Sequence, residues 1–358
     1  MKPIVKICNQ LIGLDYPTYF IADIAANHDG SIERAKDLIY LCAESGADAA
    51  KFQNFQANTI VSDYGFKSLK NNKLSHQAKW SKSVFDTYQE ASTPLNWASI
   101  LRDTCEDAGI HYMTSPYDLD YIGELSKYVC AWKLGSGDIT WHESIDRMAG
   151  DAKPLIIATG ASNMKEVSMA VEVAKNKSDQ IILMQCNTNY TASVENFHHI
   201  ALNVLKTYKS EFPNLVLGLS DHTPGHSTVL GAVTIGARAI EKHFTDDCLR
   251  NGPDHKFSMN PNSWRDMVDA TRELESALGT SKKRVMDNEK ETVVLQRRSL
   301  RAKCDLNLGS TLKHTHIEVL RPCPINCLPP YKLKNIIGLT LKRNIKAGHC
   351  ITMEDFEN

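Results

Sequence analysis

Short hydrophobic runs alternate with longer amphipathic segments along about the first 280 residues of the chain. Each run has the length of a buried β-strand, and the segments between them carry the periodicity of helices packed on one face. Repetition of this unit is typical of a parallel sheet covered by helices. Eight runs can be counted, at residues 19–25, 47–52, 110–113, 130–134, 155–158, 181–185, 216–219 and 239–243. Eight such units predict a closed (β/α)8 TIM barrel rather than an open sheet.

Two amphipathic segments show the helical pattern clearly. The segment before Gly46 and the segment at residues 261–278 before Gly279 both keep an apolar stripe at spacings of three and four residues. A glycine suits the residue that ends a helix. In the first segment the stripe consists of Ala35, Leu38, Ile39 and Cys42. Both segments are predicted to be helices of the barrel wall.

One connection departs from the pattern. About 57 residues separate the second and third runs, and residues 63–89 among them are too polar and irregular for a barrel wall. Long connections of this kind are often functional. We therefore expect this one to overhang the mouth of the barrel.

The character of the chain changes after about residue 285. Short strand-like pieces with Gly and Pro turns follow, and residues 299–320 share a weak internal repeat with residues 338–356. This pattern predicts a compact β-rich domain of about 65 residues, small enough to need support from the barrel or a partner. The predicted division is a barrel at residues 1–285 and a small domain at residues 286–358.

Composition excludes several classes of partner. Lys and Arg total 41 against 42 Asp and Glu, so no overall charge favours nucleic acid or an anionic membrane. The N-terminal segment, interrupted by Lys6 and Asn9, fits neither a signal peptide nor a spanning helix, and no later apolar run is long enough to span. The ten cysteines form no C-x-x-C pair, which predicts mostly buried, reduced thiols in a cytoplasmic protein.

Polar residues gather where the predicted strands end, which is where barrel enzymes place their active sites. Barrel interiors otherwise favour Val, Ile and Leu, and buried charges need partners. The polar residues at this end are Asp23, Asn27, His28, Lys51, Gln53, Thr114, Ser115, Lys133, Ser136, Asp138, Thr159, Gln185, Thr188, Tyr190, Ser220, Asp221, His222, Glu241, Lys242 and His243.

His222 and His243 follow neighbouring predicted strands, so one divalent ion could bind both imidazoles, with Asp23, Glu241 or water completing its shell. Such a metal would polarise a carbonyl oxygen. The alternative is that each histidine is a hydrogen-bonded core residue. Because the two follow adjacent strands, we favour the metal site.

Lys51 and Lys133, with Ser136 and Thr159 in Gly-containing turns, could hold a phosphate and a carboxylate. The glycine motifs alone are also ordinary turn chemistry, but a lysine in an apolar run has a desolvation cost to offset. A Schiff-base aldolase with either lysine as nucleophile is an alternative that would need no metal. Asp254 follows the last strand and could accept hydrogen bonds from sugar hydroxyls or simply form a turn.

The ordered motifs IADIAANHDGS, KFQ, KLGSGDIT, IIATGAS, CNTNY, SDHTPG, IEKHFT and GPDHKFS resemble those of the sialic acid (N-acetylneuraminate) synthase family, which includes legionaminate and pseudaminate synthases. The C-terminal segment resembles the antifreeze-like (SAF) domain of that family. The resemblance implies condensation of phosphoenolpyruvate with an open-chain N-acetylated hexosamine such as N-acetylmannosamine, giving a nine-carbon 2-keto acid and phosphate, with Mn²⁺ or Mg²⁺ as the metal.

The resemblance also implies roles for individual residues. His222 and His243 match the metal ligands, and Arg321 matches an arginine that one subunit contributes to the other subunit's site, which implies a domain-swapped homodimer. The residues that match the phosphoenolpyruvate site are Lys51, Ser115, Lys133, Ser136, Thr188 and Ser220. Those that match sugar contacts are Gln53, Asp138, Tyr190, Asp254 and Arg321.

Asp23 and Asp138 stand where many relatives carry Glu, and the side chain shorter by one methylene shifts the carboxylate by about 1.5 Å. Asp23 is our candidate for orienting or deprotonating the water that adds to C2 of phosphoenolpyruvate.

Three other readings remain. The sugar could be a diacetamido-trideoxyhexose that leads to legionaminic or pseudaminic acid. A related barrel acting on a smaller sugar phosphate would need further basic residues for the second phosphate. A non-catalytic carbohydrate- or ice-binding protein would use the barrel only as a scaffold.

Overall fold

The computed structural model describes residues 2–69, 77, 80 and 82–357, and it divides into two compact units, Met1–Gly279 and Thr280–Asn358. The sequence placed this division between residues 285 and 286, a few residues further along the linking segment.

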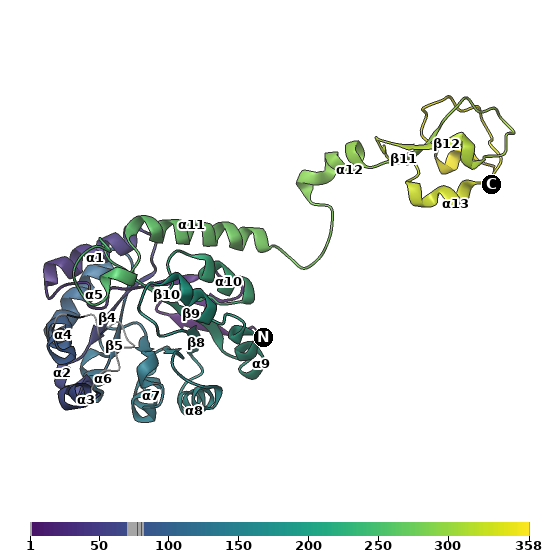
Figure 1. The fold of residues 1–358 in the computed structure, drawn as a ribbon. Helices are drawn as coiled ribbons and strands as arrows, with labels where there is room; N and C mark the ends of the chain where they lie inside the picture. The colour runs from purple at the N-terminus through teal and green to yellow at the C-terminus, as the bar shows by residue number, and fades with distance from the viewer. Residues whose placement is uncertain (1, 70–76, 78–79, 81, 358) are drawn as a thin grey trace. The chain divides into compact units, whose positions relative to one another are not determined.

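The first unit is a closed barrel of eight parallel strands, drawn in Figure 1 with helices around it. Each strand pairs with the next in sequence, and β10 pairs with β3 to close the ring. All eight strands lie at the hydrophobic runs counted in the sequence, so the predicted fold class is confirmed. The strands are β3 Tyr19–Asp23, β4 Ala49–Asn54, β5 His111–Pro116, β6 Trp132–Leu134, β7 Leu155–Ala158, β8 Ile181–Cys186, β9 Val216–Asp221 and β10 Ala239–His243.

One helix of the barrel wall follows each strand, and the two predicted helices are confirmed. The stripe predicted for α1 is buried, and α11 begins after Asn260, whose side chain accepts a hydrogen bond from the backbone N–H of Ser263. Gly46 and Gly279 both adopt the positive φ that favours glycine after a helix. The wall helices are α1 Ile32–Glu44, α5 Ala98–Asp107, α6 Leu119–Leu125, α7 His142–Ala149, α8 Met164–Lys175, α9 Val204–Glu211, α10 Ser227–Ile235 and α11 Pro261–Leu278.

A β-hairpin that the sequence analysis did not predict closes the amino-terminal end of the barrel. Its strands are β1 Ile4–Ile7 and β2 Gln10–Gly13, and the buried side chains of Val5, Ile7 and Ile12 join the hydrophobic cluster inside the barrel. That cluster is separate from the larger one between strands and helices. The mouth at the other end of the strands is therefore the end at which a cavity can form.

The expectation of reduced cysteines is wrong for four of the ten. Cys8, in the turn of the hairpin, is bonded to Cys130 just before β6, and Cys327 is bonded to Cys350 in the second unit. The Cα atoms of these pairs lie 5.8 and 5.7 Å apart, but 122 and 23 residues separate them in sequence. Spacing along the chain cannot reveal pairs that only the fold brings together.

In its described part, the long connection after β4 contains three short α-helices before α5: α2 Ala57–Ile60, α3 Asp63–Ser68 and α4 Val84–Ala91. Part of the polar stretch predicted to overhang the mouth, namely residues 70–76, 78–79 and 81, lies outside the described residues. The described part supplies side chains to the cavity at the mouth, as shown below.

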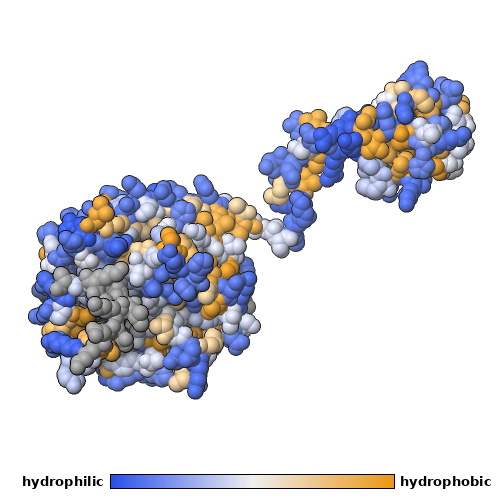
Figure 2. Space-filling model, in the orientation of Figure 1, coloured by the Kyte–Doolittle hydropathy of each residue, from blue (hydrophilic) through white to orange (hydrophobic). Residues whose placement is uncertain are grey.

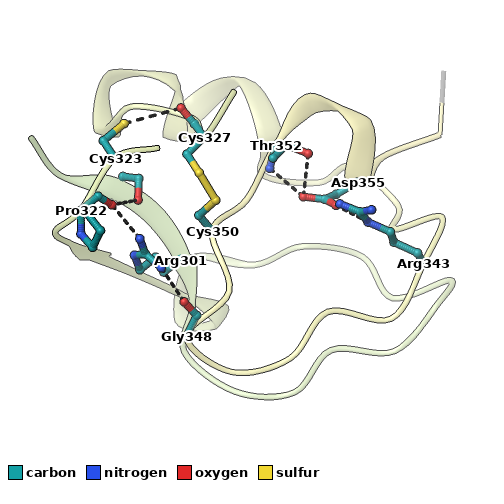
Figure 3. Close-up of a disulfide and its surroundings, with 10 residues drawn as sticks. Arg301, Pro322, Cys323, Cys327, Arg343, Gly348, Cys350, Thr352 and Asp355 are labelled. Atoms are coloured by element: carbon teal, nitrogen blue, oxygen red, sulfur yellow. Dashed lines mark hydrogen bonds and ion pairs between the residues drawn. A yellow bond between two sulfur atoms is a disulfide. The ribbon is translucent and has the colours of Figure 1, made fainter. Parts of the chain in front are cut away.

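The second unit has its own small core and little regular structure. A short helix, α12 Lys290–Gln296, precedes the antiparallel strands β11 Ser299–Ala302 and β12 Ile317–Leu320, and α13 Leu333–Ile336 follows them. The two halves of the weak sequence repeat pair through isolated bridges such as Leu306 with Ile345. Figure 3 shows Cys327–Cys350 and the contacts of the buried Asp355 with Thr352 and Arg343, which join neighbouring turns.

No helix in the described part of the chain is both long enough and apolar enough to cross a membrane. On the face drawn in Figure 2, hydrophilic residues cover most of the barrel unit and hydrophobic residues occur in small groups between them. Small, scattered groups of this kind are normal on a surface that faces water.

The hairpin should contribute measurably to barrel stability. Ile7 is fully buried inside the barrel end, so Ile7→Ala should lower the free energy of unfolding by about 2–5 kcal/mol, the cost of a cavity in a packed core. Ile4→Ala on the same strand is the control, because Ile4 is 44% exposed. Urea denaturation followed by the fluorescence of the buried tryptophans measures both, and equal effects of the two variants would contradict a closing role for the hairpin.

Candidate active site

A cavity of about 320 Å³ lies at the carboxyl ends of the barrel strands. The structure brings twelve of the predicted site residues together in its lining. They are Asp23, Lys51, Gln53, Lys133, Ser136, Asp138, Thr188, Tyr190, Ser220, His222, His243 and Asp254.

Four buried charges, Asp23, Lys51, Lys133 and Glu241, line one part of the cavity; we call them the four-charge cluster. The Lys51 Nζ atom lies 2.6 Å from Asp23 Oδ2 and 3.6 Å from Glu241 Oε2, and the Lys133 Nζ atom lies 2.9 Å from Glu241 Oε1. Ser220 also donates to Glu241 Oε1 at 3.2 Å. The strands supply all four, so their spacing is fixed by the barrel register. Glu241 therefore has a central place in the site. From the sequence, Glu241 was only a possible metal ligand.

Electrostatics within the four-charge cluster favour the charged forms of Lys51 and Glu241. Burial alone would lower the pKa of Lys51, but the attraction of Asp23 and Glu241 outweighs it and raises that pKa. Burial opposes ionisation of Glu241 as well, yet Lys133 and Lys51 lower its pKa. Two lysines and two carboxylates compensate one another's charge, and the lysines still border the cavity. An anion of suitable size would therefore meet ammonium groups that are already charged and held in place.

His222 and His243 lie beside this cluster with ring centroids 5.4 Å apart. The Nδ1 of His222 lies 3.0 Å from the Asn187 carbonyl oxygen, a contact that places the proton on Nδ1. The Nδ1 of His243 is buried without a hydrogen-bond partner, and its Nε2 lies 3.5 Å from Asp23 Oδ2. Burial lowers the pKa of His243 to about 3, so its imidazole is neutral. The pair fits the donor chemistry of a divalent ion, although the described residues contain no group of three His, Cys, Asp or Glu side chains arranged to hold one.

A second buried ion pair fixes the strand ends that carry the histidines. Lys242, next to His243, pairs with Asp221, next to His222, and also donates to the Thr223 carbonyl oxygen at 2.7 Å. Hydroxyl groups from Thr223 and Thr228 satisfy the rest of the Asp221 carboxylate. This satisfied pair lowers the pKa of Asp221 despite its burial.

Serine and threonine hydroxyls converge on another side of the cavity. The Gly160 N–H donates to Ser136 Oγ at 3.0 Å, and a Cβ atom at position 160 would collide with the Thr188 hydroxyl. The glycine of the ATGAS motif therefore allows the backbone to approach Ser136 and Thr188 closely. Close packing therefore explains why glycine stands at position 160. The sequence pattern alone did not give this reason.

Aromatic side chains cover another part of the lining, and the sequence analysis did not single them out. Ring centroids lie 5.4 Å apart for Phe55 and Tyr88, 6.1 Å apart for Phe55 and Tyr117, and 6.2 Å apart for Trp80 and Tyr88. We call these four residues the aromatic wall. Trp80 and Tyr88 come from the long connection after β4, so its described part overhangs the mouth as predicted.

Two carboxylates, Asp138 and Asp254, also line the cavity, and burial raises the pKa of each to about 6. The backbone N–H of Ala26 donates to Asp254 Oδ2 at 3.1 Å. Carboxylates held in a partly apolar cavity are suited to accept hydrogen bonds from hydroxyl or amide groups of a neutral ligand.

Known proteins were compared with the chain. The model of the NeuB family matches residues 38–283, more than half of the chain, and that of the SAF domain matches residues 297–357. This chain belongs to the NeuB family. Sialic acid, legionaminic acid and pseudaminic acid synthases are its relatives, and the C-terminal unit is a SAF domain.

Individual relatives cover nearly the whole chain. The N,N'-diacetyllegionaminic acid synthase of Legionella pneumophila is 34% identical over 96% of each chain, and the pseudaminic acid synthase of Campylobacter jejuni is 30% identical over 96% of this chain and 98% of its own. The solved structure of N-acetylneuraminic acid (sialic acid) synthetase from Leptospira borgpetersenii, in complex with citrate, is 25% identical with a TM-score of 0.70. It covers 82% of this chain and 96% of that one.

One residue assigned by resemblance, Ser115, is not among the described residues that line the cavity of this NeuB-family barrel. Ser115 is buried at the end of β5, and its Oγ atom has no hydrogen-bond partner. Gln53, its neighbour on β4, does line the cavity. The expected contact of Ser115 with the ligand remains a prediction. Arg321 is an exposed residue of the SAF domain, and its predicted role remains a prediction.

The ion pair beside the histidines gives a stability prediction. Lys242→Met would leave the Asp221 carboxylate buried without its cation and should lower the free energy of unfolding by about 3–5 kcal/mol. Lys67→Met, which breaks an exposed pair with Asp63, should leave it nearly unchanged. Urea denaturation at pH 7 compares the two. An equally small effect of both variants would contradict a structural role for the buried pair.

Proposed function

We propose that this chain condenses phosphoenolpyruvate with the open-chain form of an N-acetylated amino sugar, giving a nine-carbon 2-keto sugar acid and phosphate. The observation that carries this proposal is the pair of buried lysines, charge-compensated by Asp23 and Glu241, beside two histidines in one cavity. Membership of the NeuB family supports the same reaction.

In this proposal Lys51 and Lys133 bind the phosphate and carboxylate of phosphoenolpyruvate. Each ammonium group has three donors, and the carboxylates of the four-charge cluster do not use all of them. Hydroxyls from Ser136, Thr188 and Ser220 line the same cavity and complete the clamp. The described lining residues contain no Lys or Arg beyond this pair, which disfavours a substrate that carries a second phosphate.

His222 and His243 would hold a divalent metal, Mn²⁺ or Mg²⁺. When bound, the metal supplies Lewis-acid polarisation of the aldehyde oxygen. The unpartnered Nδ1 of the neutral His243 supports this assignment, because it leaves an imidazole lone pair available.

The side chains of the site then assist two bond-forming steps, the formation of the new C–C bond at C3 of phosphoenolpyruvate and the addition of water at C2. The lysines hold phosphoenolpyruvate so that its C3 attacks the aldehyde carbon and forms the C–C bond. The aldehyde oxygen becomes a hydroxyl by taking up a proton that the water adding at C2 releases. Water adds at C2, and phosphate leaves with the bridging oxygen as the C2–O bond breaks and the ketone forms. Asp23 orients or deprotonates that water. Its Oδ2 atom lies 2.6 Å from Lys51 Nζ and accepts from Gln53 Nε2 at 3.2 Å, so the carboxylate is fixed at the cavity surface.

The aromatic wall favours a second candidate for the sugar. Apolar faces at Phe55, Trp80, Tyr88 and Tyr117 suit a methyl group or a second acetamido group better than an extra hydroxyl. A diacetamido-trideoxyhexose has both a methyl group at the end of its carbon chain and a second acetamido group. N-acetylmannosamine has neither of these two groups. The name of the Legionella pneumophila relative, an N,N'-diacetyllegionaminic acid synthase, is consistent with a diacetamido-trideoxyhexose.

The proposal includes a cytoplasmic, domain-swapped homodimer in which Arg321 of the SAF domain contacts the acyl group of the sugar in the other subunit's site. Exposure of Arg321 is compatible with this role. A small core that leaves Ile325 and Tyr331 85% and 79% exposed also supports a partner for the SAF domain.

The reaction is tested by phosphate release from phosphoenolpyruvate with N-acetylmannosamine and the two diacetamido-trideoxyhexoses that lead to legionaminic and pseudaminic acids. We expect sugar-dependent release that a chelator abolishes and Mn²⁺ restores. Absence of release with every sugar would contradict the function, and chelator-insensitive release would contradict the metal. A higher kcat/KM for N-acetylmannosamine than for both other sugars would contradict the reading of the aromatic wall.

Asp23→Asn tests the role of the carboxylate. We expect kcat to fall by about 100-fold, the usual size of a general acid–base contribution, with a smaller change in the KM for phosphoenolpyruvate. Asp37→Asn, on the exposed face of α1, is the matched control. Turnover of Asp23→Asn close to that of the unmodified enzyme would show that another group activates the water.

A further inference from the structure

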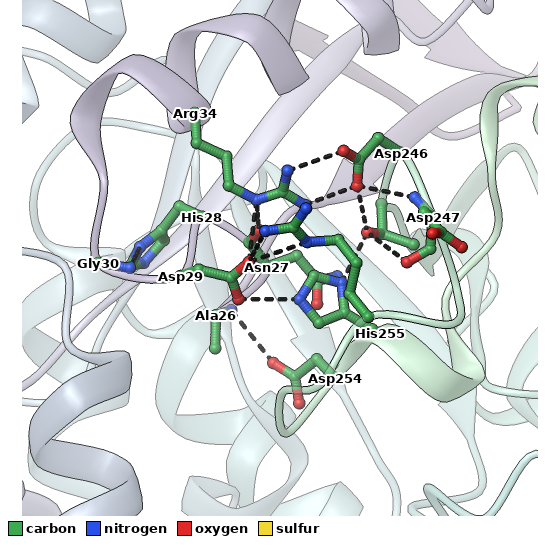
Figure 4. Close-up of polar contacts among 12 residues, drawn as sticks. Ala26, Asn27, His28, Asp29, Gly30, Arg34, Asp246, Asp247, Asp254 and His255 are labelled. Carbon is green, nitrogen blue, oxygen red and sulfur yellow. Dashed lines mark hydrogen bonds and ion pairs between the residues drawn. The ribbon is translucent and has the colours of Figure 1, made fainter.

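Polar side chains outside the cavity join the loop after β10 to the loop after β3 (Figure 4). We call this set the rim network, and its members are Asp29, Arg34, Thr245, Asp246, Arg250 and His255. None of these side chains belongs to the described lining of the cavity. Any effect of the rim network on the reaction must therefore pass through another residue.

His255 is the central member of the rim network. Its ring is fully buried, with Nε2 lying 2.9 Å from Asp29 Oδ1 and Nδ1 lying 2.7 Å from Thr245 Oγ1. Both ring nitrogens therefore have a polar partner, Asp29 on the loop after β3 and Thr245 on the loop after β10. A Cβ atom on Gly252 would lie 2.5 Å from the His255 ring, so the glycine allows the backbone to close over it. The orientation of His255 is therefore fixed from three sides.

Two arginines complete the attachment between the loops. Arg34 makes a paired contact with Asp246, at 2.7 and 2.6 Å, and donates to the Asn27 carbonyl oxygen at 2.8 Å. Arg250 donates to Asp29 Oδ2 at 2.9 Å. Asp29 itself has a φ of 50°, in the left-handed region that few non-glycine residues adopt. Its contacts with both loops hold it in this conformation.

Asp254 is where the rim network meets the cavity, because it directly precedes His255 and lines the cavity wall. The Ala26 N–H donates to its Oδ2 at 3.1 Å, and its carbonyl oxygen accepts from Ser258 Oγ at 2.7 Å. Asn27 Nδ2 in turn donates to Ser258 Oγ at 2.9 Å. The carboxylate thus depends for its position on the same two loops that the rim network joins.

We propose that His255 and Asp29 are positioning residues that hold the Asp254 carboxylate against the sugar. This inference rests on the proposed function, in which Asp254 accepts a hydrogen bond from a sugar group. None of the hydrogen bonds given above for the rim network reaches Lys51 or Lys133 of the phosphoenolpyruvate clamp, so the two substrates should respond differently to its loss.

The experiment measures the KM for each substrate in His255→Gln, Asp29→Asn, Asp254→Asn and the double variant His255→Gln/Asp254→Asn. His198→Gln, an exposed histidine of the same barrel, is the matched control. We expect the KM for the sugar to rise about tenfold or more in both rim variants, as for loss of a hydrogen bond to a charged group. The KM for phosphoenolpyruvate should stay within about twofold, and the double variant should be little worse than Asp254→Asn alone.

Several outcomes would overturn this inference. An unchanged sugar KM, equal rises in both KM values, or additive effects in the double variant would show that the rim network only stabilises the fold. Asp29→Asn keeps the size of its side chain and decides the question if His255→Gln fails to fold. Failure of the proposed function is distinct, because the unmodified enzyme would then release no phosphate with any of the three sugars, and the inference would fall with it.

Discussion

Compensation of buried charge is the constraint on which this structure depends. Two lysines at the end of a packed barrel would be too costly to desolvate without partners, and Asp23 and Glu241 provide them. The barrel makes this possible because consecutive strands bring side chains that are far apart in sequence to one level. The resulting four-charge cluster is neutral overall and borders the cavity at the mouth. In our proposal phosphoenolpyruvate binds to the lysines without a large rearrangement of the protein.

The surrounding structure keeps this arrangement in place. At the amino-terminal end, the hairpin closes the barrel with Ile7 and Ile12, so the mouth is the end left for ligands. At the carboxyl end, the Asp221–Lys242 pair fixes the strands that carry the two histidines. The rim network then joins two loops behind Asp254. All three lie outside the cavity, and the buried pair and the rim network each hold a different part of its lining in place.

The sequence was sufficient for the barrel because each of its strands is a nearly continuous apolar run, buried on both faces. It was also sufficient for the twelve lining residues named above, since strand ends in such a barrel converge by geometry alone. It did not predict the hairpin, whose short alternating strands resemble an irregular N-terminal segment. It could not predict Cys8–Cys130, because 122 residues separate the two cysteines. The sequence also did not predict the central place of Glu241 or the aromatic wall. Both depend on distances between side chains rather than on spacing along the chain.

The central claim is that Lys133 binds phosphoenolpyruvate through a charge that Glu241 holds in place. Calorimetric titration of phosphoenolpyruvate into the unmodified protein, Lys133→Met and the exposed-site control Lys206→Met, without sugar, tests it most directly. The account predicts binding to the unmodified protein and the control, with a dissociation constant raised at least about tenfold in Lys133→Met, as for one lost charged hydrogen bond. Equal affinity in a folded Lys133→Met variant would contradict it.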